Sequence, residues 1–425
     1  MKDPKQPMSH RNLELCLASP VLYPPRGGAE IRFLRYLPGL LQRGINVQLL
    51  SGTPKAKKLT KQDMAEDWYR IPAGSIVPTE PYDGVPIHRV RLPDKSGWRR
   101  VAIFNQALLR YCSEAQQKPD IVQLIEPLSP LAAPWLSRLK HLNITRAFAY
   151  TLPYELPENG FKRGLRQILL RLLYSQLDCV VTGSEATRAH ALSLGLRIRT
   201  EVIPNGVNLQ RFRPVNSDAR SALRSSLGID DNAKIITTVG SIIPRKGIDL
   251  LLESWASLAN RFPELHLVLI GPRTDKIDPK LKTFHDHLVK LINDSGASGR
   301  IHFTGRLSNV EMYLQASDLF VFTSEREGMA NVVLEAMASE LAVVMTPHIG
   351  LPPDFGQPGT HYLLADRNKE SISTTIEKLL DDHQRCHKLA QNARKWVEET
   401  MDLESVLDQY ARLYHEISDR KRTAI

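Results

Sequence analysis

Short apolar runs alternate with longer stretches of helical period along almost the whole chain. In the first half these runs predict strands at residues 13–19, 45–50, 86–91, 120–125, 145–150, 179–183 and 201–203. In the second half they predict strands at residues 234–240, 265–271, 300–305, 319–324 and 341–346. Helical periods lie between the strands, for example at residues 30–43, 98–116 and 161–176. Strand–helix alternation of this kind predicts an α/β fold in which helices cover both faces of parallel sheets.

The alternation pauses after the turn at residues 203–207, where a polar stretch reaches to residue 231. We therefore predict two doubly wound, Rossmann-like domains, residues 1–210 and 211–400. Residues 401–425 are helical in pattern and could return to the first domain. Residues 53–82 show no clear period, which predicts a long loop that is either functional or a solvated insertion.

Composition excludes several classes of protein. Of 425 residues, 42% are hydrophobic and 24% charged, an ordinary globular balance. No run approaches the roughly 18 apolar residues of a membrane helix, and the polar N-terminus does not resemble a signal peptide. The four cysteines are Cys16, Cys112, Cys179 and Cys386, and none of them has C-x-x-C spacing to another. We therefore expect a reduced, cytoplasmic protein without structural zinc.

The net charge of +10 is unevenly distributed. Residues 1–210 carry 29 basic and 17 acidic side chains, whereas residues 211–425 carry 27 and 29. This excess predicts an anionic partner for the first domain, such as an acidic acceptor or an anionic membrane surface. Nucleic acid is a weaker interpretation, because the basic residues lack interleaved aromatic residues and no nucleic-acid motif is present.

Residues 161–174 form a basic amphipathic helix that allows two interpretations. Its apolar stripe consists of Leu165, Ile168, Leu169, Leu172 and Leu173, and its cations are Lys162, Arg163, Arg166 and Arg171. A helix lying on a membrane surface has this composition. We favour the alternative, an ordinary helix that packs this stripe on the sheet, because helices between strands normally show the same pattern.

The most informative segment for chemistry is residues 323–338, where a strand ends, a turn follows at Gly328, and a helix is predicted from about Asn331. A helix N-terminus at the carboxyl edge of a parallel sheet is a binding site for phosphate. Glu327 and Glu335 would repel a phosphate there unless they bind hydroxyl groups, which sugars and riboses supply. Acidic residues favoured by the helix dipole are the alternative explanation.

Two further segments have the same strand–turn–helix form. Arg245 and Lys246 follow the strand at residues 234–240, where they could neutralise a diphosphate. Gly27 and Gly28 follow the first strand and permit close approach of a phosphate or sugar to the backbone. Taken singly, each segment is better explained without a ligand, the first as a solvated basic turn and the second as a plain tight turn. Neither the dinucleotide fingerprint nor the P-loop motif occurs.

Together these segments resemble the donor motif of the family 4 retaining glycosyltransferases. The acidic pair Glu327 and Glu335 has the E-x7-E spacing of that family within its Gly-Met-Ala-Asn context. The likeness covers most of the chain, in family order, through Gly27-Gly28, Pro204-Asn205-Gly206-Val207, Pro244-Arg245-Lys246-Gly247 and Ala342-Val343-Val344. It implies a GT-B architecture in which the second domain binds a nucleotide diphosphate sugar.

The resemblance also implies roles for individual residues. Arg245 and Lys246 would hold the diphosphate and stabilise the departing nucleotide, and Glu335 would bind the ribose. Glu327 would bind the donor sugar, and with the two cations it forms the predicted catalytic set. The backbone amides of Gly328, Met329, Ala330, Asn331 and Val332 would meet sugar and phosphate, with Gly28 approaching from the first domain. Since the family needs no metal and no D-x-D sequence occurs, we expect neither metal nor cofactor.

Some positions depart from the family. Gln123, Ile125 and Pro153 stand where histidines are common, Ser241 where an arginine is frequent, and Glu340 where a glycine is common. The donor half is therefore better supported than the acceptor half, in which Glu126 is our candidate for an acceptor contact, with a capping role equally plausible.

The resemblance thus implies a retaining hexosyltransferase that transfers a sugar from a nucleotide diphosphate sugar to a glycan, a lipid-linked molecule or another acceptor in glycan or cell-envelope polysaccharide biosynthesis. The charge of the first domain suggests an anionic acceptor. It would be cytoplasmic and peripheral on the inner face of the membrane. Two alternatives stay open, a nucleotide-sugar epimerase or hydrolase of the same fold and a non-catalytic nucleotide-sugar-binding protein.

Overall fold

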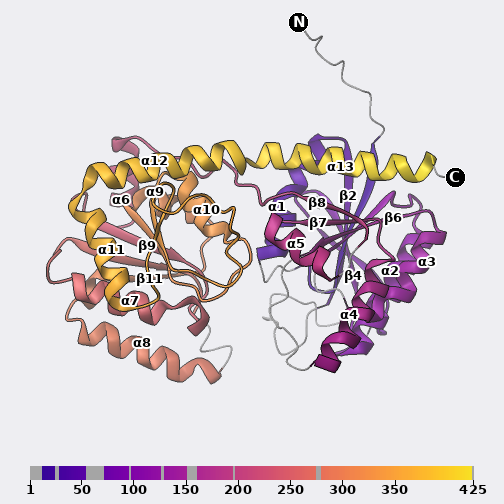
Figure 1. Ribbon diagram of the computed structural model, residues 1–425, viewed down its shortest axis with the longest axis horizontal. Helices are drawn as coiled ribbons and strands as arrows, with labels where there is room; N and C mark the ends of the chain where they lie inside the picture. The colour runs from indigo at the N-terminus through magenta and orange to yellow at the C-terminus, as the bar shows by residue number, and fades with distance from the viewer. Residues whose placement is uncertain are drawn as a thin grey trace, which may run out of the picture. The chain divides into compact units, whose positions relative to one another are not determined.

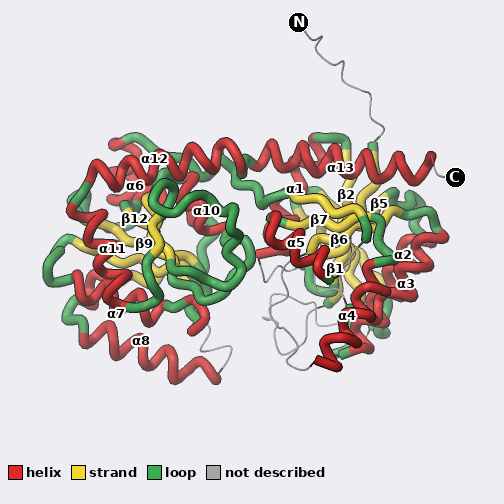
Figure 2. The backbone as a smooth tube through the Cα atoms, in the orientation of Figure 1, coloured by secondary structure: helices red, strands yellow, loops and turns green. Residues whose placement is uncertain are grey.

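The computed structural model describes residues 12–23, 28–53, 71–94, 97–125, 129–150, 160–194, 197–273 and 279–423. The chain divides into two compact units, one formed by residues 1–204 together with 404–425 and the other by residues 205–403 (Figure 1). Each unit contains one sheet with helices packed around it, as the tube view shows (Figure 2). The chain is thus an α/β protein with two sheets, as the strand–helix alternation predicts.

The first unit is built on an eight-stranded sheet of order β3-β4-β2-β1-β5-β6-β7-β8. Its strands are β1 (Leu13–Ser19), β2 (Ile45–Gly52), β3 (Ile76–Tyr82), β4 (Val85–Val90), β5 (Ile121–Ile125), β6 (Thr145–Tyr150), β7 (Cys179–Thr182) and β8 (Arg199–Val202). Its helices are α1 (Gly28–Gln42), α2 (Trp98–Glu114), η3 (Pro130–Ala132), α3 (Ala133–His141), α4 (Gly160–Tyr174), α5 (Glu185–Ser193) and α13 (Leu403–Thr423).

The second unit is built on a six-stranded sheet of order β11-β10-β9-β12-β13-β14, parallel in every pair. Its strands are β9 (Lys234–Val239), β10 (Leu265–Ile270), β11 (Ile301–Gly305), β12 (Leu319–Phe322), β13 (Ala342–Met345) and β14 (Leu363–Leu364). Its helices are α6 (Ser217–Ser226), η4 (Pro244–Lys246), α7 (Ile248–Leu258), η5 (Pro279–Leu281), α8 (Lys282–Asp294), η6 (Ser298–Arg300), α9 (Val310–Ala316), α10 (Asn331–Ala338), α11 (Lys369–Asp381) and α12 (His383–Thr400).

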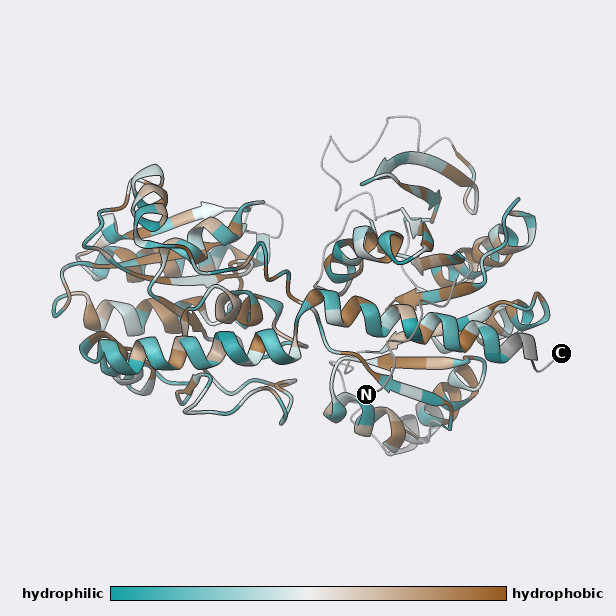
Figure 3. Cartoon of the chain, turned by 90° about the horizontal axis from the view of Figure 1, so that it is seen from above, coloured by the Kyte–Doolittle hydropathy of each residue, from teal (hydrophilic) through white to brown (hydrophobic). Residues whose placement is uncertain are grey.

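The cores lie between the sheets and their helices. The largest fully buried side chain of the second unit is Trp255 of α7, which packs with leucines of β10. In Figure 3 the face of α12 turned to the viewer is largely hydrophilic, and along α13 hydrophilic and hydrophobic residues alternate. Apolar residues that alternate with exposed ones on these helices are therefore buried against the units they cover.

The C-terminal helix α13 packs within the first unit. Tyr410 contacts Phe33 and Tyr36 of α1, with ring centroids 6.0 and 5.6 Å apart. Tyr414 donates a buried hydrogen bond of 3.2 Å to Oε1 of Gln123 on β5. This helix therefore completes the core of the first unit, although the whole second unit separates the two in sequence.

The second unit begins at Asn205, earlier than the predicted start at residue 211. The backbone of Val207 explains the difference, because its N–H donates to Met401 and its carbonyl accepts from Leu403, at 2.8 and 3.0 Å. This short parallel bridge fixes residues beyond the turn to the end of α12.

The prediction of a loop over residues 53–82 is wrong at its C-terminal end, where the chain forms strand β3, which pairs antiparallel with β4. A two-residue turn of Asp83 and Gly84, with φ of 47° and 78°, joins the two strands. Asp-Gly between apolar runs is a strong hairpin signal, and Pro78 and Pro81 suit an edge strand. The first sheet is therefore mixed at this edge. Residues 54–70, which include Lys55, Lys57 and Lys58, lie outside the described residues.

We predicted that the helix at residues 161–174 packs its apolar stripe on the sheet, and this prediction is wrong for part of the stripe. Ile168, Leu169 and Leu172 are 55%, 41% and 56% exposed, whereas Leu173 is buried. The helix α4 contacts η3 and α3 and enters the core through Leu173 and Tyr174. Because this buried face is narrower than the stripe, three large apolar side chains remain at the surface.

Candidate functional site

Three charged side chains predicted to act together meet at the carboxyl edge of the second sheet. Arg245 and Lys246 lie in η4, just after β9, and Glu327 lies in the loop between β12 and α10. Arg245 Nη1 and Lys246 Nζ are 2.6 and 2.7 Å from the same oxygen, Glu327 Oε1. Ser324 Oγ donates to that oxygen as well, at 2.9 Å. The site is therefore a compact network centred on one carboxylate oxygen.

Two glycines make the close approach of η4 to the sheet possible. Gly247 has φ of 65°, and a Cβ atom there would lie 2.4 Å from the carbonyl oxygen of Thr323. A Cβ atom on Gly240 would lie 3.0 Å from Cε of Lys246. The lysine stem thus occupies the space above Gly240, which directs its ammonium group toward Glu327.

The loop that carries Glu327 is held on both sides by backbone hydrogen bonds. The N–H of Glu325 donates to the carbonyl of Arg245, and the N–H of Glu327 donates to that of Ile349, each at 2.9 Å. Thr323 Oγ1 donates to the carbonyls of Lys246 and Gly247 at 3.1 and 2.9 Å. This pinning fixes the carboxylate before any ligand binds.

The electrostatics of the site favour an ionised Glu327. Burial by itself would raise the pKa of this carboxyl group, but Lys246, Arg245 and the Ser324 hydroxyl outweigh burial and hold the pKa below its ordinary value. Two cations therefore share one anion, and the site carries a net positive charge that suits an anionic ligand.

The helix α10 begins at Asn331, as predicted, and no side chain caps it. Glu335, one turn into the helix, is 4% exposed. The Nδ2 group of Asn205 donates to Oδ1 of Asn331 at 2.5 Å, so the turn at residues 204–207 supports the first residue of α10. Of the connecting residues, Gly328, Met329 and Val332 are half-buried and Ala330 is buried. The donor residues predicted in the second domain thus share one edge of one sheet.

The candidates in the first domain are less completely placed. Gly28 is the first residue of α1, whereas Gly27, Glu126 and Pro153 lie outside the described residues. Gln123 is fully buried and accepts the hydrogen bond from Tyr414. Its amide is therefore committed to the core of the first unit. Ile125 is also buried, with 2% exposure.

His348 is a site residue that the sequence reasoning missed. It follows β13, is 9% exposed, and packs edge-on against Phe322 with ring centroids 5.5 Å apart. Burial lowers its pKa, and Glu327 and Lys246 both interact with it electrostatically. Its Nε2 atom has no hydrogen-bond partner among the described residues. Its position just beyond the carboxyl end of a central strand was the available signal.

The described residues contain no group of three or more histidine, cysteine or acidic side chains that could hold a metal ion. Nor do the described helices include one with both the length and the apolar content needed to cross a membrane. The chemistry that the described site supplies is that of fixed cations, a carboxylate and backbone amides.

Two family models match the chain, one for each unit. Glycosyl transferases group 1 matches residues 219–396, and the Glycosyl transferase 4-like domain matches residues 27–206. Together with the two Rossmann-like units, these matches identify a glycosyltransferase of the GT-B fold. The chain belongs to the family 4 type of glycosyltransferases.

Relatives of similar sequence agree with this assignment, and a solved structure agrees with the fold. The chain is 28% identical over 322 residues to the lipopolysaccharide core biosynthesis glycosyltransferase LpsE of Rhizobium meliloti, covering 75% of this chain and 87% of LpsE. It is 30% identical over 208 residues to mannosylfructose-phosphate synthase of Agrobacterium fabrum, covering 48% and 42% of the two chains. Its fold is similar to that of HepE from Anabaena, crystallised in complex with UDP, with a TM-score of 0.70, 18% identity and coverage of 95% and 99%.

Proposed function

We propose that the protein transfers a hexose from a nucleoside diphosphate sugar to an anionic acceptor, with retention of configuration at the anomeric carbon. The observation that carries this proposal is the convergence of Arg245 and Lys246 on one oxygen of Glu327 at the carboxyl edge of the second sheet. A diphosphate needs fixed cations, and a sugar needs a fixed hydrogen-bond acceptor for its hydroxyl groups. The cluster supplies both within one network.

The two cations would act on the leaving group. As the bond between the sugar and the diphosphate breaks, negative charge grows on the phosphate oxygen and positive charge on the sugar ring. Arg245 and Lys246 stabilise the first of these charges, and Glu327 binds the hydroxyls of the sugar beside the second. Glu335 would bind the ribose, and the amides from Gly328 to Val332 would orient the sugar and the phosphate.

Retention would follow if the acceptor oxygen attacks the anomeric carbon on the same face from which the diphosphate departs. The acceptor oxygen forms its bond to the anomeric carbon while the diphosphate leaves with the bonding electrons. The departing phosphate oxygen takes the proton of the acceptor hydroxyl, so charge and atoms balance without a covalent enzyme intermediate. Because Lys246 and Arg245 provide the positive charge, we propose that no metal ion is needed.

The acceptor side is proposed from charge and surface. The excess of basic residues lies in the first 210 residues, which suits an anionic glycan or lipid-linked acceptor. The exposed Ile168, Leu169 and Leu172 of α4 give the first unit an apolar surface that can enter the interface of an anionic membrane. We propose on this basis a peripheral enzyme of the cytoplasmic membrane face. The name of LpsE supports a role in cell-envelope glycan synthesis.

One experiment tests the donor site. Purified protein is screened by thermal shift against UDP-, GDP- and ADP-sugars, and the selected donor is used to measure transfer. We expect Lys246→Ala to reduce transfer at least 100-fold, while Lys290→Ala, a control on the remote helix α8, leaves it unchanged. Full activity of Lys246→Ala would contradict the assignment. Turnover of labelled donor with and without acceptor separates transfer from hydrolysis.

A further inference from the structure

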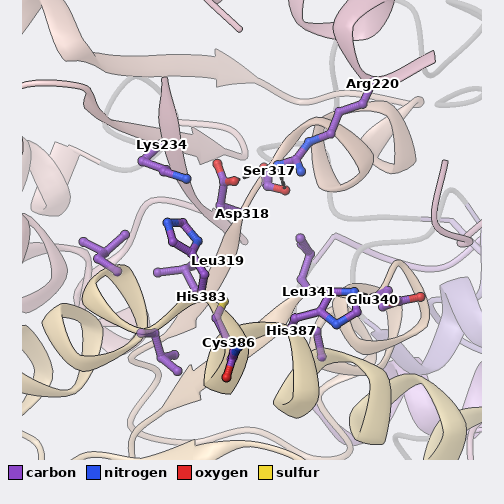
Figure 4. Close-up of a pocket in the computed structure, with 14 residues that line it drawn as sticks. Arg220, Lys234, Ser317, Asp318, Leu319, Glu340, Leu341, His383, Cys386 and His387 are labelled. Atoms are coloured by element: carbon purple, nitrogen blue, oxygen red, sulfur yellow. Dashed lines mark hydrogen bonds and ion pairs between the residues drawn. The ribbon is translucent and has the colours of Figure 1, made fainter. Parts of the chain in front are cut away.

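The second unit contains a pocket of about 460 Å³ at the edge of the sheet opposite the donor residues (Figure 4). Lys234 opens β9, Asp318 immediately precedes β12, and Glu340 lies two residues before β13. His383, Cys386 and His387 reach the pocket from the first turns of α12. Because Arg245, Lys246 and Glu327 follow the other ends of β9 and β12, the strands themselves separate this pocket from the donor site.

One side of the pocket is positively charged. Asp318 accepts hydrogen bonds from Arg220 and Arg224, each at 2.9 Å, and from the backbone N–H of Ile235 at 2.8 Å. Its charge is therefore compensated by two guanidinium groups. Lys234 makes no ion pair within the described part of the chain. Figure 4 shows its side chain on the same side as Asp318 and His383. An ammonium group in this setting is available to a phosphate.

The other side offers a hydrogen-bond acceptor. Glu340 Oε1 lies 4.0 Å from His387 Nε2, and the two side chains are 25% and 67% exposed. The backbone of Glu340 has φ of 59°, a left-handed conformation that favours glycine. A carboxylate is thus kept at a position where its own backbone is strained, and strained non-glycine residues concentrate at functional sites.

The floor between these two sides is apolar. It consists of Leu319, Leu341, Leu379, Leu380 and Ala390. The volume falls within the range of small-molecule sites in proteins. An inorganic anion would leave the floor and Glu340 unused, and a cation would be repelled by Lys234 and Arg220. A ligand that uses all three parts carries a phosphate, several hydroxyl groups and a face of carbon-bound hydrogens.

We propose that this pocket binds a small phosphorylated sugar. Its phosphate lies against Lys234, Arg220 and His383, and its hydroxyls donate to Glu340. The ring rests on the leucine floor. This would be a second site, separate from that of the donor, through which the level of a sugar phosphate acts on the enzyme. It does not depend on the proposed function, since it uses none of the donor residues.

Cys386 provides a direct test, because Cys16, Cys112 and Cys179 are buried and it is the more accessible thiol. Burial raises the pKa of Cys386 to about 11, so alkylation by iodoacetamide is followed at pH 9 by mass spectrometry. Glucose 6-phosphate should slow its alkylation at least fivefold, whereas glucose and inorganic phosphate at equal concentrations should slow it less than twofold. Equal rates in all samples, or full protection by phosphate alone, would refute a sugar phosphate site.

The nucleoside diphosphate product of the donor provides a second arm. Because the pocket and the donor residues lie at opposite edges of the sheet, a saturating amount of that product should leave the protection by glucose 6-phosphate intact. Loss of the protection would place glucose 6-phosphate at the donor edge and overturn the proposal. This arm also separates a failure of the pocket from a failure of the donor assignment.

Variants then identify the contacts, with binding of glucose 6-phosphate measured by titration calorimetry. Lys234→Gln should weaken binding at least tenfold, while Lys388→Gln, which removes an exposed charge of α12 that does not line the pocket, should leave it unchanged. Glu340→Gly should raise the melting temperature, because it relieves the left-handed strain, and yet weaken binding at least fivefold. Stabilisation without loss of affinity would show that Glu340 contacts no ligand and contradict the proposal.

Discussion

Nζ of Lys246 lies 2.7 Å from Oε1 of Glu327, and the same oxygen accepts a hydrogen bond from Arg245 at 2.6 Å. The two cations proposed to bind the diphosphate are therefore partly neutralised by the single acid proposed to bind the sugar. The Lys246 and Glu327 side chains are 15% and 18% exposed, so this ion pair is largely shielded from water. When the donor binds, its diphosphate would replace the Glu327 carboxylate as the partner of the two cations, and Glu327 would then bind the sugar.

Glu327→Gln should separate these two roles. Without the carboxylate, Lys246 and Arg245 lose the group that competes with the diphosphate, so the nucleoside diphosphate product should bind about three- to tenfold more tightly, or about 1 kcal/mol. Transfer should nevertheless fall about 100-fold, because a contact to the sugar in the transition state is lost. Calorimetry and initial rates measure the two effects. Glu325→Gln, on the exposed neighbour, is the control, and weaker product binding by Glu327→Gln would contradict the competition.

The same ion pair predicts how stability depends on pH. The folded-state pKa of Glu327 lies below its ordinary value of 4.5, so the ionised group stabilises the folded protein above that pH. This contribution disappears as the pH falls through the lowered pKa. Glu327→Gln should therefore cost about 1 kcal/mol of unfolding free energy at pH 7 and almost nothing in strong acid. Urea unfolding at several pH values measures the difference, and a constant difference would show that the charge is not responsible.

Transfer should not depend on a divalent metal. One guanidinium and one ammonium group at the carboxyl edge can supply the charge that a metal supplies in other enzymes. We expect initial rates in excess EDTA to equal those in magnesium within a factor of two. A Lys246→Ala variant rescued by magnesium would be consistent with this replacement. Loss of wild-type activity in EDTA, restored by added metal, would contradict it.

The sequence predicts those parts of the fold that are specified by neighbouring residues along the chain. The strands β1 and β6 have the predicted bounds, because a short, mostly apolar run between polar turns specifies a buried strand locally. The strand β3 was missed because it is half exposed and contains prolines, so neither a continuous run nor a regular alternation marks it. Its hairpin turn was the stronger local signal.

The site shows the same division. The E-x7-E spacing and the Arg-Lys-Gly turn place the charged residues on two loops, and parallel topology brings these loops to one edge. The convergence of both cations on one oxygen is a tertiary contact across 82 residues, which no local pattern contains. His348 and the pocket at the opposite edge were missed for this reason. The exposure of Ile168 likewise depends on how α4 meets its neighbours.

His348→Phe should distinguish a functional histidine from a core residue. Phenylalanine keeps the aromatic packing and removes a buried nitrogen that has no described partner, so stability should be unchanged or rise by about 1 kcal/mol. If the imidazole positions Glu327 or the sugar, kcat/KM for the donor should still fall at least fivefold. His348→Gln should recover part of the loss, because its amide can replace Nε2. Thermal unfolding and donor kinetics, with His287→Phe on α8 as control, test this. Full activity of His348→Phe would show that His348 contributes only to the packing of the core.

The apolar surface of α4 predicts how the enzyme meets its acceptor. Replacing both Ile168 and Leu172, each more than half exposed, by serine removes apolar area at little risk to the core. If these side chains enter a lipid interface, each contributes about 1 kcal/mol, so the double variant should bind anionic vesicles at least tenfold more weakly. Val289→Ser, an exposed apolar residue on α8 of the second unit, should leave binding unchanged. Binding to neutral vesicles should be weaker for all proteins, because the basic first unit then lacks its electrostatic attraction. Equal vesicle binding by the double variant and the wild type would assign the exposed stripe to another partner and leave the basic charge alone to direct the enzyme to its acceptor.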